Sequence, residues 1–112
     1  MTDMTVEALA ASCGLRQLAL PDSERPVNGV YIGDLLSWVM GRARSENAWI
    51  TIMSNINVIA VASLSDVSCV IFAEGVVPDE DVIRAAEQKG VNLLVSDLPI
   101  YETAEKLSTL KI

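Results

Sequence analysis

Residues 54–75, with the sequence SNINVIAVASLSDVSCVIFAEG, form the most apolar stretch of the chain and carry no charge before Asp66. The stretch could be one long strand, a buried helix followed by a strand, or a membrane segment. A membrane-spanning helix needs about 20 uninterrupted apolar residues, and Ser and Asn residues interrupt this stretch repeatedly. A single strand of this length would be unusual. Because a helical crossover between parallel strands needs about a dozen residues, the stretch predicts a helix over 55–64 and a strand over 69–73.

The predicted helix 55–64 has no clearly polar face, and a helix that is apolar all round is expected to be buried on all sides. The chain is 51% hydrophobic, with a mean hydropathy of +0.37. A domain of this size buries only a modest core, so the second cover of this helix is most simply another subunit. We therefore expect a homodimer whose interface contains Ile56, Ile59, Ala60, Ser63 and Leu64.

The remaining segments alternate between helix and strand patterns. Helices are predicted over 6–13, 35–43, 79–89 and 100–107, and the other strands over 15–20, 27–32, 46–53 and 91–96. Strands that alternate with helices favour a parallel sheet with covering helices. The sequence thus predicts an α/β fold: residues 1–112 form a single three-layer-like domain with a mostly parallel sheet of about five strands.

Several helix ends carry recognisable signals. Thr5 is expected to cap the first helix and Gly14 to end it. Gly90 is expected to end the helix over 79–89, and Asp34 to cap the helix over 35–43. In the last helix, Tyr101 and Leu107 are expected to face inward.

The charge pattern excludes one class of partner. The net charge is −7, the isoelectric point is about 4.3, and the Lys and Arg residues are scattered along the chain. Without a basic stripe we expect no nucleic-acid partner, and without an apolar span no membrane partner. The N-terminal residues lack the pattern of a signal peptide, so a cytoplasmic protein is expected, with Cys13 and Cys69 as buried thiols rather than a disulfide.

Most catalytic arrangements are missing from this sequence. The chain has no histidine, which removes the commonest general base and metal ligand. It also lacks a G-x-x-x-x-G-K-[ST] loop and a G-x-G-x-x-G fingerprint. We therefore expect no enzyme activity, no catalytic residue, no metal and no cofactor. An enzyme would have to use Asp34, Glu74 or Asp97 as its acid or base.

Polar residues follow the predicted strands at their carboxyl ends, where parallel α/β domains bind ligands. Helix starts at these ends could hold an anion through free backbone amides, or these residues could simply cap the helices. A carboxylate at Glu74 would instead suit a cation or a basic side chain of a partner. The candidate ligand-binding residues are Ser54, Asn55, Asn57, Glu74, Gly75 and Asp97.

The segment from Ile52 to Ala104 resembles the DRTGG domain family. In that family a strand leads into Asp-Arg at a helix start, a second strand ends in Thr-Gly-Gly, and a final helix begins with a motif of the T-[FY]-E-T-A type. Here Asn55 and Ile56 occupy the Asp-Arg positions, and Ala73, Glu74 and Gly75 the Thr-Gly-Gly positions. Gly75, the proline-led helix and YETA at 101–104 are retained.

The segment 27–40, VNGVYIGDLLSWVM, resembles small stand-alone DRTGG-like bacterial proteins, which are similar to the N-terminal domain of HPr kinase/phosphorylase. Relatives of this domain occur beside CBS domains in pyrophosphatases and inside some phosphotransacetylases. The resemblance implies a non-catalytic, dimer-forming or regulatory module. The expected function is therefore a homodimeric regulatory or protein-interaction module, and the alternative is a sensor of a nucleotide or phosphorylated metabolite at the strand ends.

Overall fold

The core of the protein is a five-stranded sheet with the strand order β1-β5-β4-β3-β2. The structure, a computed structural model, describes residues 4–112. The strands are β1 (Arg16–Ala19), β2 (Val30–Ile32), β3 (Ala48–Thr51), β4 (Cys69–Phe72) and β5 (Leu93–Val95). Strands β2 to β5 are parallel, whereas β1 pairs antiparallel with β5. This architecture confirms the predicted α/β class and the mostly parallel sheet.

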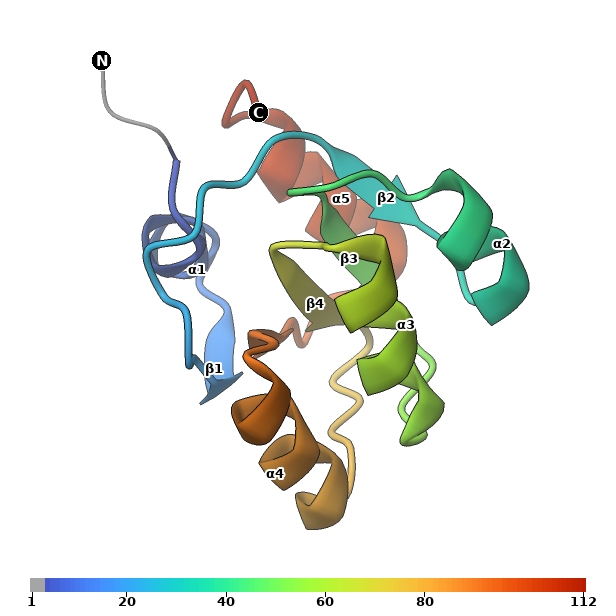
Figure 1. The fold of residues 1–112 in the computed structure, drawn as a ribbon. Helices are drawn as coiled ribbons and strands as arrows, with labels where there is room; N and C mark the ends of the chain where they lie inside the picture. The colour runs from blue at the N-terminus through green and yellow to red at the C-terminus, as the bar shows by residue number, and fades with distance from the viewer. Residues whose placement is uncertain (1–3) are drawn as a thin grey trace.

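Helices cover both faces of the sheet and make a three-layer arrangement (Figure 1). Helices α2 (Leu36–Arg42), α3 (Asn57–Ser65) and α4 (Glu80–Lys89) pack on one face. Helices α1 (Val6–Cys13) and α5 (Ile100–Ser108) pack on the other. Within residues 4–112, no helix combines the length and apolar character needed to cross a membrane.

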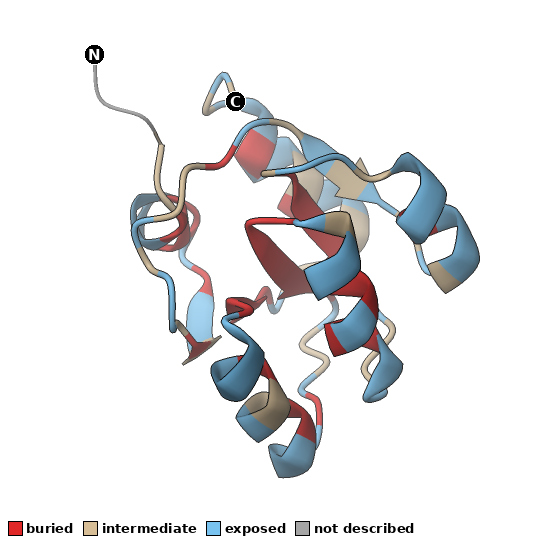
Figure 2. Ribbon diagram, viewed as in Figure 1, coloured by how far each residue is buried: buried red, intermediate tan, exposed pale blue. Residues whose placement is uncertain are grey.

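Strands β3, β4 and β5 are buried along their whole length (Figure 2). Alternate side chains serve the two faces: Trp49 and Phe72 lie in the cluster under α2, α3 and α4, while Ile50 and Ile71 lie in the cluster under α1 and α5. A strand that is buried on both faces needs apolar residues at every position. This requirement explains the continuous apolar run CVIF in β4.

Local signals at three helix ends behave as the sequence predicts. The Thr5 hydroxyl accepts a hydrogen bond from the backbone N–H of Ala8 at 3.1 Å, which caps α1. Gly14 ends α1 with φ 65°, and Gly90 ends α4 with φ 73°. Glycine adopts this left-handed conformation without a steric penalty.

Two other local predictions are wrong. Asp34 does not cap α2, because the N-cap is Leu35 and makes no side-chain capping bond. Instead, one Asp34 carboxylate oxygen accepts hydrogen bonds from the Thr51 hydroxyl at 2.7 Å and the Ile52 N–H at 2.9 Å. Tyr101 is 70% exposed rather than inward-facing. Leu107, by contrast, is fully buried as predicted.

The helix predicted at 55–64 is present as α3, and within one chain it is buried on one side only. One side of α3 packs into the core through Val58, Ile59, Val61 and Ala62. Its other side is exposed and presents Asn57, Ala60, Ser63 and Leu64 to solvent. Cover of this side by a second subunit stays a prediction; most of its exposed residues are small or polar, so solvent can also cover it.

Candidate functional site

The loop after β4 brings part of the predicted site together. Ala73 accepts a hydrogen bond from the N–H of Val76 at 3.1 Å, and the intervening residues Glu74 and Gly75 have φ 63° and 69°. Two central residues with positive φ are the signature of a type I′ turn. The Glu74 and Gly75 amides also bond to carbonyl oxygens of the loop after β5. These amides are therefore occupied by the fold itself.

Glu74 carries a conformational cost, because it is a non-glycine residue with a positive φ in the centre of this turn. In the family motif that the sequence resembles, glycine stands at this position. Replacing Glu74 with Gly is expected to stabilise the chain by about 1 kcal/mol, the typical cost of a left-handed conformation in a non-glycine residue. Urea unfolding would measure the gain. Glu87→Gly, inside α4, is the control and should destabilise by about 1 kcal/mol; a loss for Glu74→Gly would contradict the turn assignment.

Asp97, which follows β5, lies beside this turn. A carboxylate oxygen of Asp97 is 3.5 Å from the position that a Cβ on Gly75 would occupy. The same oxygen accepts a hydrogen bond from Arg16 at 2.9 Å. Sequence reasoning missed Arg16, since only the antiparallel pairing of β1 with β5, which sets Arg16 opposite Val95, reveals its position. Glu74, Gly75 and Asp97 thus form one group with Arg16.

The other predicted ligand residues form a second group at the start of α3. The side-chain oxygen of Asn55 accepts a hydrogen bond from the N–H of Asn57 at 2.9 Å. The N-cap residue itself is Ile56, so Asn55 supports the helix start from one residue earlier. Ser54 is half-buried in the same loop. Among residues 4–112, no hydrogen bond or ion pair joins this group to that of Asp97.

The charges at the carboxyl ends of the parallel strands are unfavourable for the binding of phosphate. Asp34, Glu74 and Asp97 contribute three carboxylates, and Arg16 contributes one guanidinium that already pairs with Asp97. Like charges repel an approaching anion. In the part of the chain that the structure describes, no group of three or more acidic, Cys or His side chains could hold a metal ion.

The YETA segment has a structural role that sequence reasoning did not assign. Thr103 is buried, and its hydroxyl lies 2.7 Å from the Ser96 hydroxyl. The Thr103 hydroxyl also lies within hydrogen-bond distance of the carbonyl oxygens of Leu98 and Pro99, at 3.2 and 2.9 Å. These contacts fix the loop between β5 and α5, which in turn holds the Glu74–Gly75 turn.

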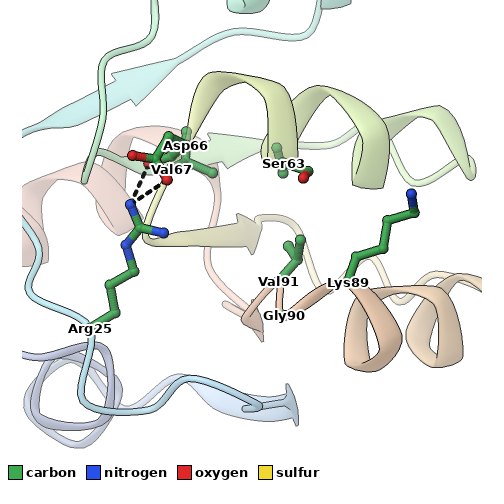
Figure 3. Close-up of a pocket in the computed structure, with 8 residues that line it drawn as sticks. Arg25, Ser63, Asp66, Val67, Lys89, Gly90 and Val91 are labelled. Atoms are coloured by element: carbon green, nitrogen blue, oxygen red, sulfur yellow. Dashed lines mark hydrogen bonds and ion pairs between the residues drawn. The ribbon is translucent and has the colours of Figure 1, made fainter.

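A cavity of about 130 Å³ lies on the opposite side of the domain from the carboxyl ends of the parallel strands, between the C-terminal ends of α3 and α4 (Figure 3). Arg25, Asp66 and Lys89 line its polar parts. Arg25 donates hydrogen bonds to the Asp66 backbone carbonyl at 2.9 Å and to its carboxylate at 2.7 Å. Cations are favourable at the C-terminal end of a helix, so this arrangement is explained by the stabilisation of the two helix ends.

Asp66 is the centre of this arrangement. It ends α3 in the left-handed conformation, with φ 60°. Hydrogen bonds from the Ser45 hydroxyl and then from Arg25 hold the pKa of the Asp66 carboxyl below its usual range. The ionised carboxylate is therefore the form that the folded chain stabilises, and this contribution is lost as the pH falls through the lowered pKa.

The cysteines are unsuited to nucleophilic chemistry. Cys13 and Cys69 are both buried and unpaired, as the sequence predicts. Burial raises the pKa of both thiols, and that of Cys69 reaches about 12. Because the thiolate is the reactive form, neither residue is a nucleophile at neutral pH.

The predicted interface residues on α3 divide into two groups. Ile59 is 1% exposed and lies in the core of its own chain, so its assignment to a subunit interface is wrong. Ile56, Ala60, Ser63 and Leu64 are exposed. The helical period explains why Ile59 differs from the other four residues: a side chain that points at the sheet cannot also reach a neighbouring subunit on the far side of the helix.

Fold and site together define a small three-layer α/β domain whose strand-end loops are held by their own hydrogen bonds. The family model described as "DRTGG domain" matches residues 17–110. The chain therefore belongs to the DRTGG domain family.

One solved structure places this fold in a larger protein. The chain is similar to the CBS and DRTGG domains of the regulatory region of Clostridium perfringens pyrophosphatase, solved in complex with the activator diadenosine tetraphosphate. The TM-score is 0.73 at 11% sequence identity. The match covers 88% of this chain but 44% of the other, so this chain spans less than half of that regulatory region. A search of curated proteins gave no match.

Proposed function

We propose that this chain is a non-catalytic regulatory module that acts as a homodimer and binds protein rather than small ligands. Membership of the DRTGG family and the fold shared with a pyrophosphatase regulatory region support the regulatory role. The observation that carries the homodimer is the distribution of exposed apolar side chains. Residues 4–112 contain ten large exposed hydrophobic residues, and seven of them fall within residues 30–56: Val30, Ile32, Leu35, Trp38, Met40, Ile52 and Ile56.

These residues belong to β2, to α2 with its preceding loop, and to the loop that leads into α3. Figure 2 shows that most of α2 is exposed. Concentrations of exposed apolar side chains of this kind mark interaction surfaces. The segment that forms β2 and most of α2 carries little charge: Asp34 is the single charged residue between Pro26 and Gly41, and Arg42 stacks on Trp38. Two copies that each carry a charge of −7 repel least when they meet through such a surface.

The alternative function, a sensor of a nucleotide or phosphorylated metabolite, has weaker support. The carboxylates of Asp34, Glu74 and Asp97 lie at the strand ends where such a ligand would bind. The amides of Glu74 and Gly75 are already bonded within the chain. A phosphate would have to overcome the charge without these donors.

Sedimentation equilibrium is expected to show a mass twice the 12.1 kDa of the chain at micromolar concentrations. Because the copies share the same net charge, added salt should strengthen the association by screening their repulsion. A mass that stays monomeric over the whole range of concentration and salt would contradict the homodimer. It would leave the fold and the family membership untouched.

A further inference from the structure

Strand β2 is a sheet edge with unused backbone groups. The N–H of Ala48 donates to the carbonyl of Gly29 at 3.0 Å, and the N–H of Gly33 donates to the carbonyl of Ile50 at 3.2 Å. In a parallel pair, the residues of one strand alternate between bonding to their neighbour and pointing away from it. Tyr31 therefore bonds to β3, and the N–H and C=O groups of Val30 and Ile32 point outward from the sheet.

Contacts at both ends hold this edge in place. At one end, the side-chain amide of Asn47 donates to the carbonyl of Asn28 at 2.8 Å. At the other end, the indole N–H of Trp49 donates to the carbonyl of Gly33 at 2.9 Å. The strand is thus fixed in its extended form before any partner arrives, which lowers the entropic cost of pairing.

The two edges of the sheet differ in how they resist further pairing. Natural edge strands are commonly protected by charged residues, proline or a bulge. Strand β1 has such protection: Arg16 is charged, and the register shifts between Gln17 and Ala19. Strand β2 has the sequence VYI, pairs with β3 in an unbroken register, and has no charged residue.

We propose that β2 pairs antiparallel with β2 of a second copy, about a two-fold axis at Tyr31, so that one continuous sheet spans both subunits. This assignment rests on the proposed homodimer and names its interface. With the axis at Tyr31, Val30 of one copy lies opposite Ile32 of the other. This register uses every outward N–H and C=O group of both residues.

The side chains of β2 fit a copy of the same strand. Val30 and Ile32 share their face with Ala48 and Ile50, on the side of α1 and α5, yet they are 37% and 46% exposed. Across the junction they would meet the same aliphatic pair, while Tyr31 would lie opposite Tyr31 on the other face. Cross-strand aliphatic and aromatic pairs of this kind stabilise a sheet.

A ladder of three residues is too small to hold a dimer alone, since stable interfaces bury on the order of 1,200 Å² or more. Helix α2 and the short loop that joins it to β2 expose Leu35, Trp38 and Met40, at 57%, 52% and 52%. Two copies of α2 would flank the β2 junction. Their apolar side chains supply the additional area that the short ladder lacks.

Cysteine cross-linking tests the register. In the proposed pairing, Tyr31 faces Tyr31 with a Cα separation of about 4.5 Å, which is within disulfide range. Tyr31→Cys should therefore form a disulfide-linked dimer under mild oxidation. Val30→Cys and Ile32→Cys are the controls: each should fail to cross-link with itself, since like residues are diagonal at roughly 7–8 Å. A mixture of the two should form the mixed disulfide, because its Cα separation is about 5.5 Å.

Hydrogen exchange on the unmodified chain provides a readout that does not depend on any substitution. The amides of Val30 and Ile32 should become protected as the concentration rises, about tenfold when nine-tenths of the chain is dimeric. Amides that exchange rapidly in a sample of dimeric mass would overturn the β2 pairing and leave the homodimer standing. Protection that does not depend on concentration would overturn it as well, because a cover within the chain would then be responsible. A monomeric mass would overturn both proposals.

Discussion

Replacing Ile59 with Asp is expected to abolish cooperative folding of the chain. Ile59 is 1% exposed and packs in the cluster between α3 and the sheet. The substitution removes a buried aliphatic side chain, which costs about 2–5 kcal/mol, and adds the further cost of an unpaired buried charge. Domains of this size have a total stability of about 5–15 kcal/mol. Circular dichroism during a urea titration should therefore show no folded baseline at neutral pH.

Leu64→Asp is the matched control on the same helix. Leu64 is 74% exposed, so the same substitution should leave the unfolding midpoint nearly unchanged. Because we place the interface on β2, this variant should also retain the dimeric mass. A folded, monomeric Leu64→Asp protein would instead move the interface to the exposed side of α3. A folded Ile59→Asp protein would contradict the placement of α3 against the sheet.

Replacing Trp49 with Ala is expected to produce the second large loss of stability. Trp49 is fully buried in β3, and removal of a buried aromatic side chain costs about 3–5 kcal/mol. The substitution also removes the indole donor to the Gly33 carbonyl, so β2 should become less well anchored. Urea unfolding would measure the loss, and hydrogen exchange should show faster exchange at Gly33.

Two controls separate these effects. Trp49→Phe keeps a buried aromatic ring but leaves the Gly33 carbonyl without its donor, so a smaller loss of about 1–3 kcal/mol is expected. Trp38→Ala removes the other tryptophan, which is 52% exposed and stacks against Arg42 at 3.7 Å. Its effect on the stability of the isolated chain should be small. Equal losses for Trp49→Ala and Trp38→Ala would contradict the burial that separates these two residues.

Much of the fold could be predicted because its signals are local. Thr5, Gly14 and Gly90 mark helix ends through contacts within a few residues of each end. The buried central strands produce continuous apolar runs that are visible in the sequence. The strand order and the antiparallel pairing of β1 were not predictable in this way, because they depend on contacts between distant segments.

The wrong predictions share the same cause. Asp34 has the residue type of a helix cap, but Thr51 and Ile52 compete for its carboxylate from a neighbouring strand. In α3 the exposed side was hard to see in the sequence, because Ala60 and Ser63 are small enough to face solvent within one chain at little cost.

The candidate site was predictable in part. The location of the site at the carboxyl ends of the strands follows from the parallel topology. The proximity of Gly75 to Asp97 agrees with that location. The partner of Asp97 was not visible, because Arg16 lies in the one antiparallel strand. The separation of the Asn55 group from the Asp97 group was also hidden, since it depends on how each loop bonds to itself.

The difference between the two sheet edges also limits how far an assembly can grow. In the sheet that the structure describes, β2 is the unprotected edge, and the proposed pairing of β2 with its own copy would consume it. The outer edges of the joined sheet would then both be β1, with the charge of Arg16 and the register shift after Gln17. An interface in which both copies use the same surface closes on itself. If β2 pairs as proposed, the joined sheet would end at two subunits and would present only its protected β1 edges to further chains.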